Sequence, residues 1–261
     1  MTAKTVDAGD FDSLAEDYSR YRPGYAPSVL AAVVGLLGRP PAGLDAADLG
    51  AGTGIWTRMV AAAGFRSVVA VEPSESMRAA GMRDCAGADS IRWQRGRGDQ
   101  SGLADGAVDL VSMASSFHWV DFDRGVAEFA RILRPGGWFV ALWNPRLIEA
   151  SPLLGEIESQ LTVLHPGLHR RSSGRSGRTE GLTERLWTCG RFDDVVALEG
   201  RHGVRQSVAQ YIGAWRSVND VQAQLGPEKF ARFLDYLGER LRDVESIDTT
   251  YLTRAWAARR P

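Results

Sequence analysis

Three glycines, Gly50, Gly52 and Gly54, alternate within five residues, directly after the apolar segment "LDAADL" and directly before "IWTRMVAAAG", which is spaced like a helix. A glycine-rich turn between a strand and a helix lets a ligand approach the backbone, and the first amide groups of the helix point toward that ligand. Acidic residues lie on both sides of the turn, Asp48 before it and Glu72 at the end of the next apolar run. This pattern predicts a small-molecule site at a strand-to-helix turn.

Two familiar phosphate-binding turns fit the glycines poorly. A Walker-type loop needs Lys followed by Ser or Thr after its last glycine, but Ile55 and Trp56 follow Gly54. A dinucleotide fingerprint needs glycine at its first, third and sixth positions, and Ile55 occupies the sixth. The Walker alternative is therefore excluded. A dinucleotide remains an alternative to a ligand that carries a ribose but no phosphate.

Four segments resemble the motifs of class I S-adenosylmethionine-dependent methyltransferases, in the same order over about 100 residues. The segment "DLGAGTG" resembles the first motif, and "VVAVEPSESM" resembles the second. The segment "GRGDQSGLADGAVDLV" resembles the turn after the third strand, and "ILRPGGWFVAL" resembles the helix-turn-strand signature before strand five. The resemblance implies that S-adenosylmethionine is the cofactor and that a methyl group is transferred.

Two further segments, "FDSLAEDYSRYRPGY" and "SSFHWVD", resemble the small-molecule branch that includes trans-aconitate methyltransferase-like proteins. In that branch the N-terminal segment folds over the cofactor, and the His-Trp pair stands on the substrate side of strand four. The resemblance is clear over residues 10–145 and weak after them. The later residues are the ones that would determine the substrate pocket.

The resemblance also implies which residues bind the cofactor. Glu72 can accept hydrogen bonds from both ribose hydroxyls, Asp99 faces the adenine amino group, and the Arg22 guanidinium suits the methionine carboxylate. Several of the expected cofactor-binding residues also have a purely structural alternative to cofactor binding. The alternative is a tight turn for the glycines, core packing for Met77, and a surface position for Arg22. The expected cofactor-binding residues are Tyr18, Arg22, Asp48, Gly50, Gly52, Gly54, Glu72, Met77, Gly98, Asp99 and Ser115.

The expected methyl-acceptor contacts are His118, Trp119, Asn144 and Trp215. Ligands of open parallel sheets bind outside the carboxyl ends of the strands, and His118 follows such an end. His118 is therefore the candidate general base, with a contact to the substrate or a structural role as its alternatives.

A metal site is not expected. His165 and His169 are four residues apart, but Pro166 and Gly167 between them break the helix that this spacing would need. The basic segment that follows contains Arg170, Arg171, Arg175 and Arg178. It favours a solvated lid, with recognition of an anionic substrate or of RNA as the alternative.

Strands and helices alternate along the first half of the chain, which is typical of parallel βαβ units. Strands are expected at 44–50, 67–72, 108–114 and 137–143, and helices at 26–37, 54–64, 74–82 and 121–133. The second half predicts helices, a strand at 194–205, helices over 206–242, and an edge strand at 248–260. We therefore expect an α/β, Rossmann-like, seven-stranded, mostly parallel sheet with helices on both faces and a helical cap inserted after strand five.

The same pattern predicts one structural domain in three parts. Residues 1–40 form a segment that covers the cofactor, 41–145 the cofactor-binding core, and 146–261 the cap helices and the strands that complete the sheet.

Composition narrows the function classes. The formal net charge is −1, which does not suit a chain that coats nucleic acid or an anionic membrane. The N-terminus lacks an apolar signal core, and the apolar run at 29–38 is shorter than the ~20 residues that span a bilayer. We expect a cytoplasmic monomer or homodimer whose partner is a small-molecule methyl acceptor. An RNA methyltransferase and a non-catalytic, cofactor-binding regulatory protein are the alternatives.

Overall fold

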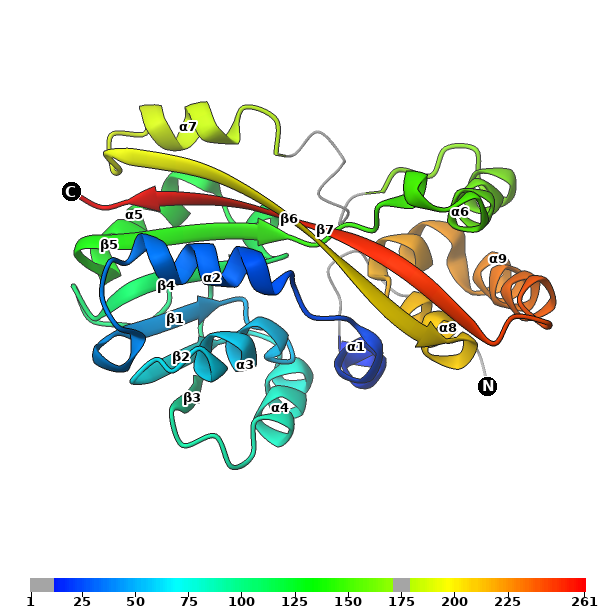
Figure 1. Cartoon of the computed structure of the whole chain (residues 1–261), viewed down its shortest axis with the longest axis horizontal. Helices are drawn as coiled ribbons and strands as arrows, with labels where there is room; N and C mark the ends of the chain where they lie inside the picture. Colours follow the sequence, from blue (N-terminus) through cyan, green and yellow to red (C-terminus); the bar gives the residue numbers. More distant parts are fainter. Residues whose placement is uncertain (1–11, 171–178) are drawn as a thin grey trace.

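The computed structural model describes residues 12–170 and 179–261, and it confirms a seven-stranded, mostly parallel sheet within them (Figure 1). The spatial order is β3-β2-β1-β4-β5-β7-β6; the first five strands are parallel, and β7 runs antiparallel to both of its neighbours. The strands are β1 (Asp45–Leu49), β2 (Ser67–Val71), β3 (Ile91–Gln94), β4 (Val108–Ala114), β5 (Leu133–Trp143), β6 (Asp194–Ser207) and β7 (Ser246–Arg259).

Helices cover both faces of the sheet and form a separate layer beyond one end of it (Figure 1). They are α1 (Ala15–Tyr21), α2 (Pro27–Leu36), α3 (Ile55–Ala62), α4 (Glu75–Asp84), α5 (Phe122–Ile132), α6 (Pro152–Leu164), α7 (Leu182–Thr188), α8 (Val208–Arg216) and α9 (Asn219–Arg240). Among the described helices, none is both long and apolar enough to cross a membrane.

Two hydrophobic clusters hold the sheet between its helices. One cluster joins the sheet to α5 and α7, and in it Phe129 stacks on Phe139 with ring centroids 4.3 Å apart. The other joins the opposite face to α2 and α3 around Trp56. Every residue of β1 is buried, as expected for a strand covered on both faces. The carboxyl ends of β1, β2 and β4 are therefore fixed in a rigid layer.

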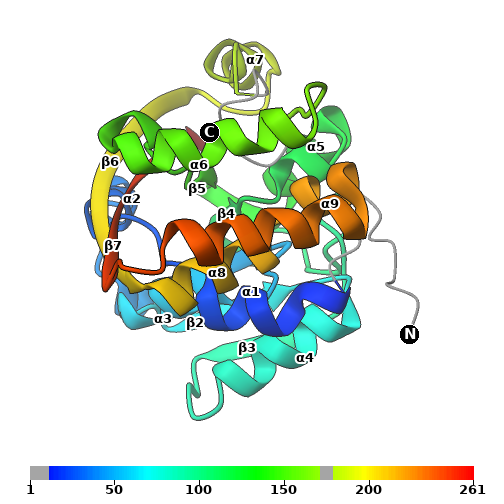
Figure 2. The ribbon, with the colours of Figure 1, turned by 90° about the vertical axis from the view of Figure 1, so that its right-hand side faces the viewer.

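A cap of α6, α8 and α9 stands beyond the carboxyl ends of the parallel strands (Figures 1 and 2). It has a core of its own, in which the rings of Trp215 and Phe233 are 5.0 Å apart. The chain enters the cap twice, because α6 follows β5 whereas α8 and α9 lie between β6 and β7. The cap thus follows strand five in the chain, as expected, and it is built in two parts, one before β6 and one after it.

The C-terminal strand is not at the edge of the sheet, which corrects the sequence-based prediction. β7 lies between β5 and β6, and β6 is the edge strand. Ala255 to Ala258 of β7 are all buried, as an inner strand requires, whereas β6 alternates between exposed and half-buried side chains. The polar residues earlier in β7 produced the misleading alternation, because that half of the strand extends past β5, paired with β6 alone, and reaches the cap.

Candidate active site

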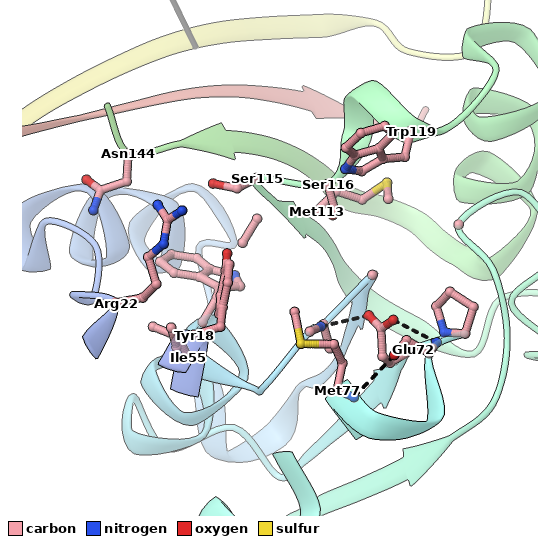
Figure 3. A pocket seen from close by; sticks show the side chains of 18 of the residues that line it. Tyr18, Arg22, Ile55, Glu72, Met77, Met113, Ser115, Ser116, Trp119 and Asn144 are labelled. Carbon is pink, nitrogen blue, oxygen red and sulfur yellow. Dashed lines mark hydrogen bonds between the residues drawn. The ribbon is translucent and has the colours of Figure 1, made fainter. Parts of the chain in front are cut away.

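A cavity opens at the carboxyl ends of β1, β2 and β4, beneath α1 (Figure 3). This is where the strand order reverses between β1 and β4, the position at which open α/β sheets bind ligands. Its volume of about 330 Å³ lies within the range of small-molecule sites. The residues that line the cavity come from segments far apart in the sequence, the first of them Tyr18 and the last Tyr251.

The glycine turn after β1 forms one wall of the cavity. Gly50 and Gly52 line it, and Gly50 has a φ of 66°. A Cβ at Gly50 would lie 2.8 Å from the Cβ of Ser116, so a larger residue would push the turn away from β4. Gly54 does not line the cavity. It caps α3 with a left-handed φ of 78°, and a Cβ there would lie 2.9 Å from the Trp93 indole. Gly54 therefore allows the turn to pack against Trp93, on the side away from the cavity.

The Glu72 carboxylate is fixed between the glycine turn and α4 (Figure 3). Its Oε2 accepts a hydrogen bond from the Gly52 amide at 2.8 Å, and its Oε1 accepts one from the Ser74 amide at 2.9 Å. Ser74 in turn caps α4 by accepting from the Met77 amide. Glu72 is 7% exposed and lines the cavity, so a buried, oriented carboxyl group stands where the sequence predicts a contact with ribose hydroxyls.

Gly98 and Asp99 lie in the same wall, and Met77 lines the cavity as well. The Asp99 carboxylate lies 3.1 Å from Arg97 Nε and 3.3 Å from an Arg124 nitrogen. Burial raises the pKa of Asp99, but the hydrogen bond and charge of Arg97, with Arg124, outweigh it and hold this pKa below its usual value. Asp99 is therefore an anion at neutral pH. Arg97, also a lining residue, was not predicted from the sequence.

Asp48 lies behind the glycine turn and does not line the cavity. Its side chain accepts hydrogen bonds from the Thr57 hydroxyl at 2.6 Å and the Ser112 hydroxyl at 3.2 Å. Burial, together with the nearby Glu72 charge, raises the pKa of Asp48 to about 7 against the lowering effect of these two hydrogen bonds. Asp48 thus ties β1, α3 and β4 together beneath the turn.

Asp48→Asn should change how stability depends on pH. The folded protein holds the Asp48 proton more tightly than the unfolded chain, since its pKa rises from 3.8 to about 7. The Asp48 contribution to the free energy of unfolding therefore falls as the pH rises through this window. Asn does not titrate, so the variant should gain stability relative to the wild type between about pH 5 and about pH 8. Urea unfolding at both pH values measures this, and an equal difference at the two would contradict it.

Helix α1 covers the cavity and is fixed to the cap. Arg22 donates from Nε to the Ser217 hydroxyl at 2.8 Å and from Nη2 to the Ser217 carbonyl at 3.1 Å. Its guanidinium also lies 5.1 Å from the centre of the Tyr18 ring. Both Tyr18 and Arg22 line the cavity, so the structure brings them together with the glycine turn and Glu72.

The wall between α1 and β5 contains Ser115 and Asn144, and also Tyr25, which was not predicted. Tyr25 and Ser115 share a hydrogen bond of 2.9 Å between their hydroxyl oxygens. Asn144 donates to the Gly24 carbonyl at 2.9 Å and accepts from the Thr253 hydroxyl at 2.7 Å. Nothing in the sequence pattern distinguished Tyr25 from the other aromatic residues of its segment.

Trp119 lines the cavity and is 45% exposed, but His118 is not among the lining residues. The Nδ1 atom of His118 accepts a hydrogen bond from Trp143 Nε1 at 3.3 Å. A neutral imidazole that accepts at Nδ1 carries its proton on Nε2, where it acts as a donor. The geometry therefore does not fit the prediction that His118 is a general base, and His118 packs between Trp119 and Trp143 instead.

Trp215, the remaining predicted acceptor contact, also lies outside the cavity. It is fully buried in the cap core, with the Arg146 guanidinium 4.1 Å from its ring centre. The prediction is corrected because Trp215 belongs to the buried face of α8, which a single amphipathic pattern cannot distinguish from a pocket-lining face.

The described part of the basic segment is paired rather than free for a ligand. Arg170 lies 2.7 Å from Glu158 and 3.4 Å from Asp220. Arg171, Arg175 and Arg178 lie outside the described residues. Within the described ranges, no three His, Cys, Asp or Glu side chains come together as metal ligands.

Residues 47–141 match the family model described as a methyltransferase domain. An uncharacterized methyltransferase of Mycobacterium tuberculosis is 39% identical over 151 residues, which cover 56% of this chain and 57% of that protein. A ubiquinone/menaquinone biosynthesis C-methyltransferase of Rubrivivax gelatinosus is 36% identical over 104 residues, 40% of each chain. The chain thus spans little more than half the length of the curated relatives it matches.

Solved structures extend the likeness to nearly the whole chain. A protein assigned as a type II methyltransferase from Anaeromyxobacter dehalogenans aligns with a TM-score of 0.64 and 24% identity, covering 92% of this chain and 98% of that one. A protein assigned as a methyltransferase of an antibiotic biosynthesis pathway, from Anabaena variabilis, aligns with a TM-score of 0.60 and 22% identity, covering 90% and 98%. The chain therefore carries a methyltransferase domain at residues 47–141 within the Rossmann-like fold of methyltransferase structures.

Proposed function

We propose that this protein transfers a methyl group from S-adenosylmethionine to an oxygen or nitrogen atom of a small metabolite. The observation that carries the proposal is the Glu72 carboxyl group, which is buried and oriented by the Gly52 and Ser74 amides at the cavity wall. A carboxylate in this place suits two ribose hydroxyls. Ile55 stands where a dinucleotide fingerprint has its third glycine, which supports S-adenosylmethionine over a dinucleotide.

The lining residues suit the rest of the cofactor. Asp99 and the Gly98 backbone lie beyond Glu72, where the adenine would extend from the ribose. Met77 contributes an apolar surface to the same wall, and it packs against Ala15, Ala80 and Tyr18. The opposite end, near Arg22, suits the methionine carboxylate, since a guanidinium can pair with it through two parallel hydrogen bonds.

Methyl transfer from a sulfonium needs mainly positioning, because the donor is already activated. Holding the acceptor atom and the methyl carbon in line, about 3–3.5 Å apart, can supply an effective molarity of order 10⁵ M or more. The rigid carboxyl ends of β1 and β4 and the α1 cover are suited to this task. The mechanism that we propose does not use His118, whose ring lies outside the cavity lining. It fits best an acceptor that is already deprotonated at neutral pH.

The assignment of a small metabolite as the methyl acceptor rests on the resemblance to trans-aconitate methyltransferase-like proteins and on the size of the cavity. The α1 cover and the cap leave a cavity of small-molecule size, which favours a metabolite over RNA. A cytoplasmic location and a monomeric or dimeric state belong to the same proposal. A regulatory protein that binds the cofactor without catalysis is the second candidate.

Incubation of the protein with methyl-deuterated S-adenosylmethionine and a metabolite extract tests the proposal. We expect a small-molecule product that carries three deuterium atoms, detected by mass spectrometry, together with S-adenosylhomocysteine. Label that appears in RNA would favour the RNA methyltransferase alternative. Cofactor binding without any labelled product across extracts would favour the regulatory protein.

A further inference from the structure

We infer that His202 is a positioning residue that holds the hinge of the α1 cover. The hinge is the segment 22–26, which joins the end of α1 at Tyr21 to the start of α2 at Pro27 (Figure 1). His202 belongs to β6 and is not among the residues that line the cavity, so its effect on the cofactor is indirect. The inference rests on the proposed function and deepens it, because it assigns to a residue outside the cavity the control of how long α1 stays closed.

Three neighbouring strands hold the hinge by hydrogen bonds. The Gly24 carbonyl lies 2.9 Å from His202 Nε2, in β6, and 2.9 Å from Asn144 Nδ2, just after β5. Two residues further along the hinge, the Ala26 amide donates to the Thr253 hydroxyl of β7 at 2.8 Å. The end of the hinge that leads into α2 is therefore tied to the sheet at two points.

The surroundings of the His202 ring determine which of its nitrogens donates. A carbonyl oxygen only accepts, so the proton of the neutral ring lies on Nε2 and points at Gly24. Burial lowers the pKa of His202 more than the Gly24 hydrogen bond raises it, so the ring is neutral at neutral pH. The Nδ1 atom is buried and has no hydrogen-bond partner within the described residues. The bond to Gly24 is thus the polar contact through which the ring acts.

The two helices that the hinge joins are held unequally. Helix α2 buries Val29 and Val33 in the hydrophobic cluster on its face of the sheet. A Cβ at Gly200 of β6 would lie 2.6 Å from the Ser28 hydroxyl, so the start of α2 fits closely against β6. Of the seven described residues of α1, in contrast, only Ala15 is buried. Opening of the cover should therefore leave α2 in place and pivot α1 at the hinge.

The His202 ring also contacts the cavity wall. It stacks on the Tyr251 ring, with the ring centroids 5.6 Å apart and the planes at 29°. Tyr251 lines the cavity, and so do Pro23 and Tyr25 of the hinge. A hinge that is fixed at Gly24 thus sets the positions of the lining residues on either side of it.

His202→Leu removes the donor and leaves the Gly24 carbonyl with the Asn144 hydrogen bond alone. One hydrogen bond of this kind changes an equilibrium by about three- to tenfold, so α1 should open more often. The dissociation rate of S-adenosylhomocysteine, measured by surface plasmon resonance on the immobilised full chain, should rise by about this factor. His202→Gln, whose amide nitrogen can take the place of Nε2, should restore a rate close to that of the wild type.

His169→Leu and His169→Gln are the matched controls, because His169 is exposed on the segment after α6. Both should release S-adenosylhomocysteine at the wild-type rate. If His202→Leu does not fold, His202→Asn replaces it, because the shorter side chain ends before the Nε2 position. A wild-type release rate in His202→Leu, or an equal acceleration in His202→Gln, would overturn the inference whatever the melting temperatures.

Trypsin digestion without ligand separates the hinge from the proposed function. Cleavage after Arg20, an exposed residue of α1, requires the helix to leave its place and unwind locally. It should be faster in His202→Leu than in the wild type, whereas cleavage after Lys229 of α9 should be unchanged. Equal cleavage after Arg20 in the two proteins would overturn the role of His202. If the wild type does not bind S-adenosylhomocysteine, the proposed function fails, and the digestion alone decides on the hinge.

Discussion

Glu72→Ala should weaken the binding of S-adenosylhomocysteine by at least tenfold while the protein stays folded. The carboxylate accepts hydrogen bonds from Gly52 and Ser74 and is placed to accept two more from the ribose. Hydrogen bonds to a charged group contribute roughly 1.5–3 kcal/mol each, and about 1.4 kcal/mol corresponds to a tenfold change in affinity. The variant loses the ribose contacts and also the anchor that holds the glycine turn against α4. Isothermal calorimetry measures the affinity, and circular dichroism checks the fold.

Glu75→Ala is the matched control for Glu72, because Glu75 is an exposed carboxylate three residues further along the chain, at the start of α4. Its affinity for S-adenosylhomocysteine should equal that of the wild type. Glu72→Gln should fall between the two, since an amide keeps the shape but loses the charge. An unchanged affinity of Glu72→Ala would mean that the ribose lies elsewhere, and with it the cofactor.

Gly213→Ala should loosen the α1 cover and weaken cofactor binding. Gly213 lies on the buried face of α8, and a Cβ there would lie 2.5 Å from the Tyr21 ring of α1. Overpacking of this kind typically costs about 1–3 kcal/mol, and α1 can relieve it by moving off the cap. Such movement would stretch the bonds of Arg22 to Ser217 and displace Tyr18 from the cavity wall. We expect a lower melting temperature and a several-fold loss of affinity for S-adenosylhomocysteine.

Limited proteolysis distinguishes movement of α1 from a general loss of stability. In Gly213→Ala, cleavage around residues 15–26 should be faster than in the wild type and less protected by S-adenosylhomocysteine. Gly238→Ala is the control, because Gly238 is exposed on α9 and a Cβ there meets no other atom within 4 Å. This control should be neutral or more stable by up to about 1 kcal/mol. Identical cleavage of wild type and Gly213→Ala would show that α8 does not hold the cover.

The sequence predicted the part of the fold in which local pattern and packing agree. The alternation of β1, α3, β2 and α4 follows from apolar runs, glycine stops and the Ser74 cap, all of which are local signals. Glu72 was identifiable as a lining residue because a strand end and a motif fixed its position together. The direction of its carboxylate, toward the Gly52 and Ser74 amides, required the structure.

The remainder depended on contacts between distant segments. β7 pairs with β5 across 111 to 121 positions and with β6 across 39 to 65 positions, so its place inside the sheet is set by contacts between distant residues. Tyr25 meets Ser115 across 90 residues, and no local pattern reports such a pair. His118 and Trp215 had plausible residue types in plausible segments, but their rings face Trp143 and the cap core respectively.

Titration of the full chain with S-adenosylhomocysteine, beside a parallel titration with NAD, tests the central claim most directly. The glycine turn, the oriented Glu72 carboxylate and Asp99 predict saturable one-to-one binding of S-adenosylhomocysteine. No measurable binding of NAD is expected, because Ile55 stands where the dinucleotide fingerprint has its third glycine. Measurable binding of NAD would contradict the account, and so would a folded protein that gives no heat of binding with S-adenosylhomocysteine.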